Sequence, residues 1–307
     1  MALTLAEAIA RVPQWAGAHE IKTAPLGGGI TNRNFRVDVD GESFVLRIGG
    51  EKTELLGIDR HHERAANEAA AAIGLAPEVV YFIEPEGYLV TRFLGASTLP
   101  CPEMVRPENI RRVALALRRF HAIPSIPGSF SPFQTVDAYA EIARRYAVTF
   151  PGNFDWLTAR RQEIESALRR YPFTPRPCHN DLLNENFLDD GTICILDWEY
   201  AGMGDPAFDL ANFSVHHGFS DEQDRLLLDA YLAANPLTEG WSIEVRFARH
   251  KLLKIISDFR EAMWGVVQIG ISTLDFDFRA YAGKHFGRMA EMARDSRYGD
   301  WLRAFQV

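Results

Sequence analysis

One stretch of the sequence, "NFLDDGTICILDW" at residues 186–198, constrains the fold more than any other. Its apolar residues stand on either side of Asp190-Gly191, a dipeptide typical of tight hairpin turns, so two short antiparallel strands are predicted. Counting outward from the turn places Asn186 and Asp197 opposite each other to within about two residues. An amide oxygen and a carboxylate so placed suit Mg²⁺, which takes few protein oxygens together with phosphate and water. The stretch therefore predicts a metal-binding hairpin.

A third polar residue precedes this hairpin. Asp181 lies in "HND", five residues before Asn186, at the head of the loop that enters the first strand. From there its carboxylate can face a substrate hydroxyl on the far side of the ion. Protein kinases space their catalytic aspartate, asparagine and later metal-binding aspartate in this manner. The spacing predicts Asp181 as the catalytic base and Asn186 and Asp197 as metal ligands; the alternative is an Asx-rich loop that only forms its own turns.

The spacing of apolar residues changes near residue 95. Before it, alternating apolar residues predict hairpins at residues 35–48 and at "EVVYFIE" with "GYLVTRFL", separated by an alanine-rich helix that ends at Gly74. After it, helical spacing predicts helices, at 110–120, 137–147, 157–171, 221–234, 242–264 and 279–293. We expect an α+β, bilobal fold with a small antiparallel-sheet lobe at residues 1–94 and a large helical lobe at residues 95–307. A ligand cleft is common at such a junction.

The first lobe carries features that suit a nucleotide. In "PLGGGITNRNF", Gly28 and Gly29 let backbone N–H groups approach phosphate oxygens, and Thr31 and Asn32 add polar groups. Arg47 ends a strand where a protein kinase carries lysine, and its guanidinium can clamp phosphates and pair with a carboxylate, either Glu63 or Glu68. The alternatives are a simple turn and a surface arginine. No P-loop motif is present in the sequence.

Composition limits the partners. A formal charge of -8 and a pI near 5.6 argue against nucleic acid and anionic membranes, which require basic surface, and suit a cationic substrate. We find neither a secretory signal nor an apolar stretch long enough to span a bilayer, so a cytoplasmic protein without membrane insertion is expected. The three cysteines lack metal-site spacing and are expected to be ordinary thiols.

The motifs "PLGGGITNRNF", "FVLRIGG", "CHNDLLNENFL" and "ILDWEYAGMGDPAFDLANF" resemble the choline/ethanolamine kinase family. That family belongs to the aminoglycoside-phosphotransferase-like kinases, which share the protein-kinase fold. The resemblance implies ATP and Mg²⁺ as cofactors, with Arg47 on the nucleotide phosphates and Glu63 as its partner. It also implies that the backbone of the hinge holds adenine, at Arg92, Phe93 and Leu94. Asp209 would brace the catalytic loop, whereas its position alone equally allows a helix cap.

The resemblance also implies an acceptor pocket. Aromatic faces and carboxylates hold cationic amines, and the residues assigned to the acceptor are Glu199, Trp264, Phe276 and Tyr281; for the aromatic residues the alternative is helix core. The chain departs from the family at "WGVVQ", which lacks the second tryptophan of animal choline kinases. It departs again at His216 and His217, near where an acidic residue is common. We expect these histidines at the surface or in a loop, with pocket lining as the alternative.

The sequence therefore predicts an ATP- and Mg²⁺-dependent phosphotransferase that acts on the hydroxyl of a small cationic amino alcohol, choline first and ethanolamine second. Thiamine and aminoglycosides are alternative acceptors within the same fold. A non-catalytic nucleotide-binding regulatory protein is the alternative from another class, and a purely structural α+β protein is a third. Both are disfavoured, since all three polar groups that the chemistry needs are present.

Overall fold

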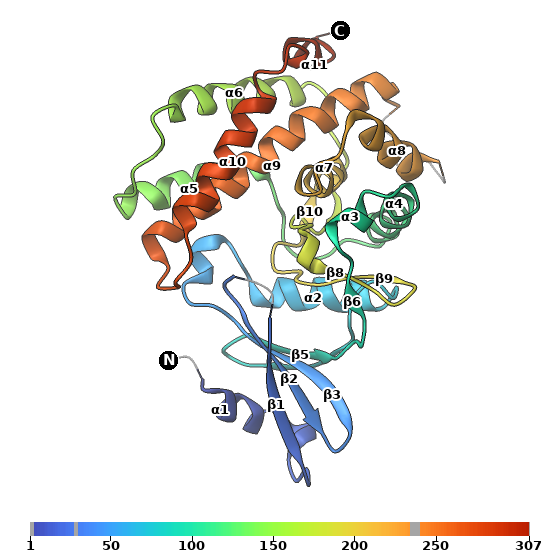
Figure 1. Cartoon of the computed structure of the whole chain (residues 1–307), viewed down its shortest axis with the longest axis vertical. Coiled ribbons are helices and arrows are strands. Elements are labelled where there is room, and N and C mark those ends of the chain that lie inside the picture. Colours follow the sequence, from blue (N-terminus) through green and yellow to red (C-terminus); the bar gives the residue numbers. More distant parts are fainter. Residues whose placement is uncertain (1–2, 28–29, 234–239, 307) are drawn as a thin grey trace. The chain divides into compact units, whose positions relative to one another are not determined.

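The structure is a computed structural model and describes residues 3–27, 30–233 and 240–306. The chain forms two compact units (Figure 1). The first comprises Met1–Leu99 and Glu185–Tyr200, and the second comprises Pro100–Asn184 and Ala201–Val307. The metal-binding hairpin predicted from the sequence thus packs with the N-terminal residues. The lobe boundary between residues 94 and 95 stays a prediction.

The first unit is built on a five-stranded antiparallel sheet in the order β1-β2-β3-β5-β4. Its strands are β1 (Ile21–Leu26), β2 (Arg33–Val39), β3 (Glu42–Ile48), β4 (Val79–Ile83) and β5 (Tyr88–Arg92). Both predicted hairpins are confirmed. Asp40 and Gly41 turn the first hairpin with positive φ of 49° and 91°, as a two-residue turn of this kind requires. Strand β1 was not predicted, because it contains Pro25 and is exposed over most of its length, so no alternating pattern marks it.

The core of this unit lies on one face of the sheet. Val37, Leu46, Ile48 and Val90 are almost completely buried there, and Trp15 packs on Phe44 with 5.5 Å between ring centroids. Helix α1 (Leu5–Ala10) contributes to the same cluster through Ala8. The predicted alanine-rich helix is confirmed as α2 (Arg60–Ala71), which begins after the N-cap Asp59.

A second, three-stranded sheet of the first unit holds the predicted metal-binding hairpin. Strands β8 (Phe187–Asp189) and β9 (Ile193–Ile195) pair with Phe187 opposite Ile195, and β6 (Ser97–Thr98) pairs with β8. Leu196 N donates to Asn186 O at 2.8 Å. Asp197 is the next residue, so the predicted opposition of Asn186 and Asp197 holds to within one residue. The hairpin is anchored by the Ile195 N–H, which donates to Leu75 O at 2.7 Å.

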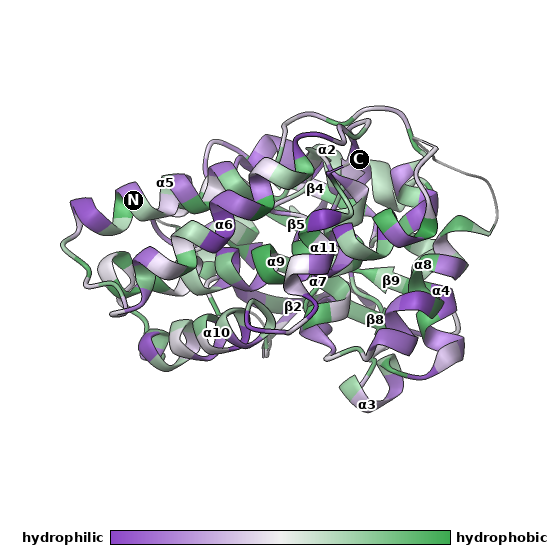
Figure 2. Ribbon diagram, turned by 90° about the horizontal axis from the view of Figure 1, so that it is seen from above, coloured by the Kyte–Doolittle hydropathy of each residue, from purple (hydrophilic) through white to green (hydrophobic). Residues whose placement is uncertain are grey.

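The second unit is mainly helical. Its helices are α3 (Cys101–Met104), α4 (Pro107–His121), α5 (Pro132–Arg145), α6 (Phe154–Leu168), α7 (Pro206–His216), α8 (Asp221–Leu232), α9 (Ile243–Ile271), α10 (Phe278–Met292) and α11 (Tyr298–Arg303). The six predicted helices are confirmed with shifted ends. Figure 2 shows hydrophilic and hydrophobic segments alternating along α4, the pattern from which it was predicted. Helix α7 was missed because it is buried on nearly all sides and has no polar face.

Helix α9 is the centre of the second unit. It is 29 residues long and most of its side chains are buried. Helix α10 runs beside it (Figure 1), and α5 and α7 also pack against it. Among the described residues, none of the helices combines the length and the apolar character that crossing a membrane requires.

A short strand pair of the second unit supports the loop that contains Asp181. Strand β7 (Arg176–Cys178) pairs with β10 (Gly202–Gly204). A side chain at Gly202 would bring a Cβ atom to 3.2 Å from the Ser129 N atom, closer than ordinary van der Waals contact. Glycine at this position therefore allows the strand and the Gly128–Ser129 backbone to meet.

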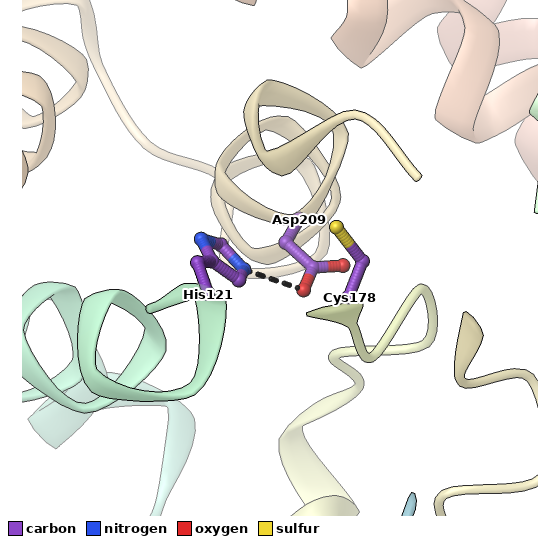
Figure 3. Close-up of side chains that lie close together, drawn as sticks. All are labelled: His121, Cys178 and Asp209. Atoms are coloured by element: carbon purple, nitrogen blue, oxygen red, sulfur yellow. Dashed lines mark hydrogen bonds and ion pairs between the residues drawn. The ribbon is translucent and has the colours of Figure 1, made fainter. Parts of the chain in front are cut away.

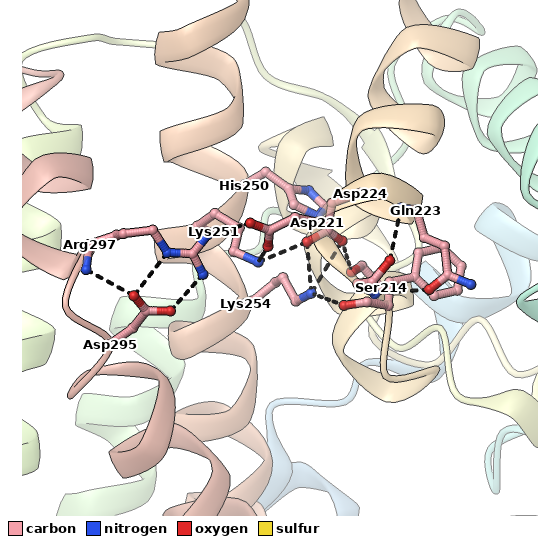
Figure 4. A network of polar contacts seen from close by, with 11 residues as sticks. Ser214, Asp221, Gln223, Asp224, His250, Lys251, Lys254, Asp295 and Arg297 are labelled. Carbon is pink, nitrogen blue, oxygen red and sulfur yellow. Dashed lines mark hydrogen bonds and ion pairs between the residues drawn. The ribbon is translucent and has the colours of Figure 1, made fainter.

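A buried ionic network joins α8 to α9 (Figure 4). Asp224 has no exposed surface and accepts hydrogen bonds from Lys251 and Lys254 at 3.0 Å each, from His250 at 3.0 Å and from the Ser214 hydroxyl. Burial by itself would raise the pKa of Asp224, but His250 and the two lysines lower it well below its usual value. Burial also lowers the pKa of His250.

We expect Asp224→Asn to lower the free energy of unfolding by about 3 kcal/mol, because it leaves buried lysines without their counter-charge. Asp221→Asn is the matched control, since Asp221 also pairs with Lys251 but its side chain is 37% exposed; it should cost about 1 kcal/mol or less. Urea unfolding measures both. Equal costs would contradict the role given to Asp224.

The same network sets a direction for the pH dependence of stability. In the unfolded chain His250 becomes protonated below about pH 6.5 and Asp224 below about pH 4. In the folded protein the pKa values of both groups are lower. Both lowered pKa values therefore make stability fall as the pH falls. The melting temperature of the wild type should decrease from pH 7 downward, and the part of the decrease that occurs below about pH 4 should be smaller in Asp224→Asn, which lacks the carboxylate.

Candidate active site

The loop that contains Asp181 is held from behind by α7. The Asp209 carboxylate accepts the backbone N–H of His179 at 2.8 Å and that of Asn180 at 2.7 Å. The next turn of the helix contributes Asn212, whose Oδ1 accepts the Leu182 N–H at 2.6 Å. Asn180 has a left-handed φ of 69°, a conformation that such contacts can hold in place. Asp209 is therefore a brace, and the alternative of a helix cap is wrong because Asp205 is the N-cap of α7.

His121 extends this brace to α4. Its Nε2 lies 3.0 Å from Asp209 Oδ2 and its Nδ1 lies 2.8 Å from the Tyr231 hydroxyl. Figure 3 shows Asp209 between His121 and Cys178, and the ligand atoms of the three residues lie within 4.8 Å of one another. This set does not suit a metal ion, because both Asp209 oxygens already accept backbone amides and burial raises the pKa of the Cys178 thiol well above its usual value. The cluster is a hydrogen-bonded support for the loop.

The side chain of Asp181 has its own partner. Arg260 Nη1 lies 2.8 Å from Asp181 Oδ1 and 2.7 Å from the carboxylate of Glu261, the next residue of α9. The Tyr281 hydroxyl of α10 donates to the other oxygen of Glu261. Burial by itself would raise the pKa of Glu261, but Arg260, His216 and His285 lower it to about 2, so this carboxylate is ionised. The sequence analysis missed Arg260, since an arginine in a helix is usually exposed.

The predicted aromatic residues of the acceptor site lie together. Trp264 is 5.4 Å from Tyr281 and 5.8 Å from Phe278, edge to face in both cases. Phe276 is 5.9 Å from Tyr281. Trp264 is almost fully buried whereas Phe276 is 41% exposed, so the cluster runs from the helix interior to the surface. Their role in holding an acceptor stays a prediction.

The two histidines after "DLANF" do not lie at the surface as expected. His217 is buried and its Nδ1 lies 2.7 Å from Phe213 O. His216 is the last residue of α7 and is half-buried, with its ring 5.9 Å from that of His285. Burial lowers the pKa of His216 to about 3, so the imidazole is neutral. The prediction of a surface position failed because helix α7, which contains His216 and ends just before His217, was not recognised.

In the first unit, Arg47 joins strand β3 to two other elements. It forms ion pairs with Glu63 of α2 and with Asp197, the latter at 2.6 Å. The pairing with Glu63 predicted by resemblance is confirmed, and Glu68 pairs instead with Arg64. Burial lowers the pKa of Arg47, although Asp197 and Glu199 act against this.

A second arginine, Arg60, extends the same network. Its Nη1 lies 2.7 Å from Glu63 and 3.0 Å from Glu199, and Asn32 Nδ2 donates to Glu199 at 3.0 Å. Burial raises the pKa of Glu199, and the charge of Asp197 raises it further. The sequence missed Arg60, although the N-cap Asp59 could have placed it in the first turn of α2, three residues before Glu63. The acceptor role predicted for Glu199 stays a prediction.

A cavity of about 550 Å³ lies entirely within the first unit. Arg47, Asn186 and Asp197 line one part of it, and the hinge residues Arg92, Phe93 and Leu94 line another. The rest is largely apolar and includes Leu26, Val45, Leu89 and Leu196. The Phe93 N–H already donates to Ser43 O at 3.0 Å, so that amide is occupied.

Three described residues that were predicted to bind the nucleotide do not line this cavity. Gly28 and Gly29 fall outside the residues that the structure describes. Thr31, Asn32 and Glu63 are not among the described residues that line the cavity. Thr31 instead packs against the chain after β3, where its carbonyl oxygen would lie only 2.7 Å from a Cβ atom at Gly50.

Asn186 and Asp197 together offer the donor set of a magnesium site. One amide oxygen and one carboxylate stand at the open end of a hairpin and line the same cavity. Asp197 has a left-handed φ of 63°, unusual for a residue other than glycine and frequent at functional positions. These ligands fit Mg²⁺, which keeps water or phosphate oxygens in its remaining positions.

Comparison with known proteins assigns the family. The model of the phosphotransferase enzyme family matches residues 22–242. The chain belongs to this family. Protein LicA of Haemophilus influenzae is 30% identical over 251 residues, which cover 80% of this chain and 72% of that protein. Human ethanolamine kinase 1 is 29% identical over 316 residues, which cover 91% of this chain and 69% of that protein.

A solved structure narrows the family further. A choline/ethanolamine kinase family protein from Mesorhizobium loti is 32% identical with a TM-score of 0.82, and the match covers 98% of this chain and 97% of that one. The phosphotransferase is thus a member of the choline/ethanolamine kinase family. Its α+β protein-kinase-like fold and its class, a small-molecule kinase, confirm the predictions. A structure described as the GDP and kanamycin complex of APH(2")-IIia is 15% identical with a TM-score of 0.66 and shares the fold alone.

We expect Asp209→Asn to lower both stability and turnover, because its amide nitrogen would face a backbone N–H where an oxygen now accepts one. The cost of an unsatisfied buried donor is about 1–3 kcal/mol. Cys178→Ala is the matched control from the same cluster and should leave turnover within about twofold, since the thiol is not needed for the brace. Thermal unfolding with and without EDTA, and steady-state kinetics, measure these effects. A drop in melting temperature with EDTA that occurs in the wild type and is lost in Cys178→Ala would contradict the brace and favour a metal, because that variant keeps the proposed Mg²⁺ ligands Asn186 and Asp197.

Proposed function

We propose that this kinase transfers the terminal phosphoryl group of ATP, bound with Mg²⁺, to the hydroxyl of a small amino alcohol, choline or ethanolamine. The observation that carries the proposal is the cavity in which a basic residue, Arg47, and a hard-oxygen pair, Asn186 and Asp197, share one wall. A nucleoside triphosphate needs those groups on its phosphates and an apolar space for its base.

The nucleotide part of the proposal rests on the first unit. The apolar part of the cavity suits the adenine ring, with the hinge residues Arg92–Leu94 beside it. Arg47 contacts the phosphates, and Glu63 fixes its guanidinium from the other side. Residues 1–94 are proposed as the nucleotide-binding lobe and residues 95–307 as the lobe with the catalytic loop and the acceptor site. A LicA structure described as a complex with AMP, 23% identical, is consistent with nucleotide use by this fold.

The chemistry requires little covalent work from the protein. Asn186 and Asp197 hold Mg²⁺, which neutralises charge that develops on the phosphates during transfer. Asp181 orients the acceptor hydroxyl and receives its proton. The brace from Asp209 keeps this carboxylate at the end of a fixed loop, so positioning dominates the rate.

The acceptor is proposed to be cationic. Trp264, Phe276 and Tyr281 form an aromatic cluster, and a positively charged amine is stabilised by aromatic faces. The relatives named as ethanolamine kinases, including human ethanolamine kinase 1, favour an amino alcohol. Choline and ethanolamine are therefore tested before thiamine and an aminoglycoside.

The first test is ADP release from ATP and Mg²⁺ with choline, ethanolamine, thiamine or an aminoglycoside as acceptor. Stimulation by choline or ethanolamine alone is the expected result. Stimulation by thiamine or an aminoglycoside would refute the proposed acceptor and keep the kinase, whereas no stimulation by any of the four would count against the proposed function as a whole.

We expect Asp181→Asn to reduce kcat by about 10³-fold or more, because the amide cannot take the hydroxyl proton. Its affinity for Mg²⁺-ATP should stay within about threefold of the wild type, since Asp181 contacts no nucleotide group in this scheme. Asp197→Asn is the contrasting variant and should weaken Mg²⁺-dependent ATP binding. Isothermal titration and steady-state kinetics distinguish the two, and substantial turnover by Asp181→Asn would reject Asp181 as the base.

We expect Trp264→Ala to raise the KM for the acceptor at least about tenfold while the KM for ATP changes less than about twofold, if the ring stabilises the bound cation. Kinetics with each substrate varied in turn measure this split. Phe286→Leu is the control, since Phe286 packs between α9 and α10 away from the Trp264 ring. Equal changes in both KM values would indicate that Trp264 only packs the helices.

A further inference from the structure

Two consecutive residues of α9, Arg260 and Glu261, are buried with relative exposures of 1% and 3%. A single nitrogen of Arg260, Nη1, lies 2.8 Å from Asp181 Oδ1 and 2.7 Å from Glu261 Oε2. Since this nitrogen carries two hydrogens, it can donate one to each carboxylate. The guanidinium therefore links the catalytic loop to the central helix of the second unit through its charge.

Arg260 contacts the side chain of Asp181, whereas the brace from α7 contacts the backbone of the loop. Asp209 and Asn212 accept N–H groups from residues 179, 180 and 182, so they fix the backbone of the loop. Rotation of the Asp181 side chain is not restrained by these bonds. Arg260 holds Oδ1 and thereby defines the direction in which Oδ2 points. A base held in this way presents one oxygen in a fixed direction, which is worth more to turnover than to binding.

Arg260 is itself held in place. Glu261 takes one of its N–H groups, and the Tyr281 hydroxyl donates to the second oxygen of Glu261 from α10. Charge favours the same arrangement, because one buried guanidinium stands between two carboxylates. The contacts form a chain from Tyr281 through Glu261 and Arg260 to Asp181.

We propose that Arg260 is a positioning residue for the catalytic base, and that Glu261 and Tyr281 hold Arg260 in the orientation this requires. The proposal rests on the proposed function, in which Asp181 receives the hydroxyl proton. It gives Tyr281 a second task besides its ring, since the hydroxyl acts through Glu261 on the geometry of Asp181.

The same pair of helices offers a matched control. Arg288 of α10 lies 2.6 Å from Asp258 of α9, so it forms a partly buried ion pair between these helices. The Asp258 Oδ1 atom also lies within hydrogen-bond distance of His285 Nδ1, at 2.8 Å. This second ion pair does not include Asp181, so its loss tests what breaking an ion pair between α9 and α10 does by itself.

The experiment compares steady-state kinetics and thermal unfolding of Arg260→Gln, Arg260→Lys, Tyr281→Phe and Arg288→Gln with the wild type. The acceptor is whichever of choline and ethanolamine the wild type phosphorylates. We expect Arg260→Gln to lower kcat by about 10²-fold with both KM values within about threefold, and Arg260→Lys to recover part of that loss. Tyr281→Phe should lower kcat by about five- to tenfold with little change in KM. Arg288→Gln should lower the melting temperature and leave kcat within about twofold.

Folding is controlled separately. Arg260→Gln leaves the Glu261 carboxylate buried without its cation, which can unfold the chain. The double variant Arg260→Gln/Glu261→Gln removes both charges of the pair, and it should fold while retaining the loss of kcat. If the double variant also unfolds, Arg260→Lys decides, because it keeps the charge and loses the geometry.

The outcomes separate the two proposals. A kcat for folded Arg260→Gln within threefold of the wild type overturns the positioning role while the kinase stands. A large rise in the acceptor KM with kcat unchanged also overturns it, because Arg260 and Glu261 would then contact the acceptor. If the wild type phosphorylates only thiamine or an aminoglycoside, the same variants are compared with that acceptor; if it phosphorylates none of the four, the proposed function fails and the positioning role falls with it.

Discussion

The first unit depends on the ion pairs that Arg47 forms with two carboxylates. Arg47 stands on strand β3 and pairs with Glu63 of α2 and with Asp197 beyond the hairpin. These two carboxylates are separated from each other by more than a hundred positions in the chain. A buried guanidinium is stable only with such counter-charges, so sheet, helix and hairpin must come together for any of the three to be satisfied. The group proposed to bind phosphate and the pair proposed to bind metal are thereby placed in one cavity.

In the second unit, buried charged groups with buried partners hold the loop that contains Asp181. Asp209 is fully buried and is satisfied by the amides of the catalytic loop and by His121, which fixes the loop backbone. Arg260 then fixes the Asp181 side chain. Backbone and side chain are held by different elements, α7 and α9, so the geometry of the carboxylate proposed as the base depends on the packing of those two helices. This explains why so many polar groups are buried in a unit that is otherwise apolar.

Local patterns predicted most of the elements. The hairpins at residues 35–48 and 186–198 were predictable because Asp-Gly turns and alternating residues are local signals. Helix α7 and strand β1 were not, since one is buried all round and the other is almost wholly exposed, so neither shows a contrast between two faces. Because α7 was missed, the burial of His217 was not predicted either. The Arg47–Glu63 pair was predictable only through the family resemblance.

The sequence by itself determined the reaction class, because the spacing of Asp181, Asn186 and Asp197 around one tight turn is a local property of the chain. Only the tertiary structure decided which charges neutralise one another. Arg260 reaches Asp181 across 79 residues and Arg60 reaches Glu199 across 139. No periodic pattern encodes such contacts, since a buried ion pair depends on how helices and strands pack and on the low dielectric of the interior.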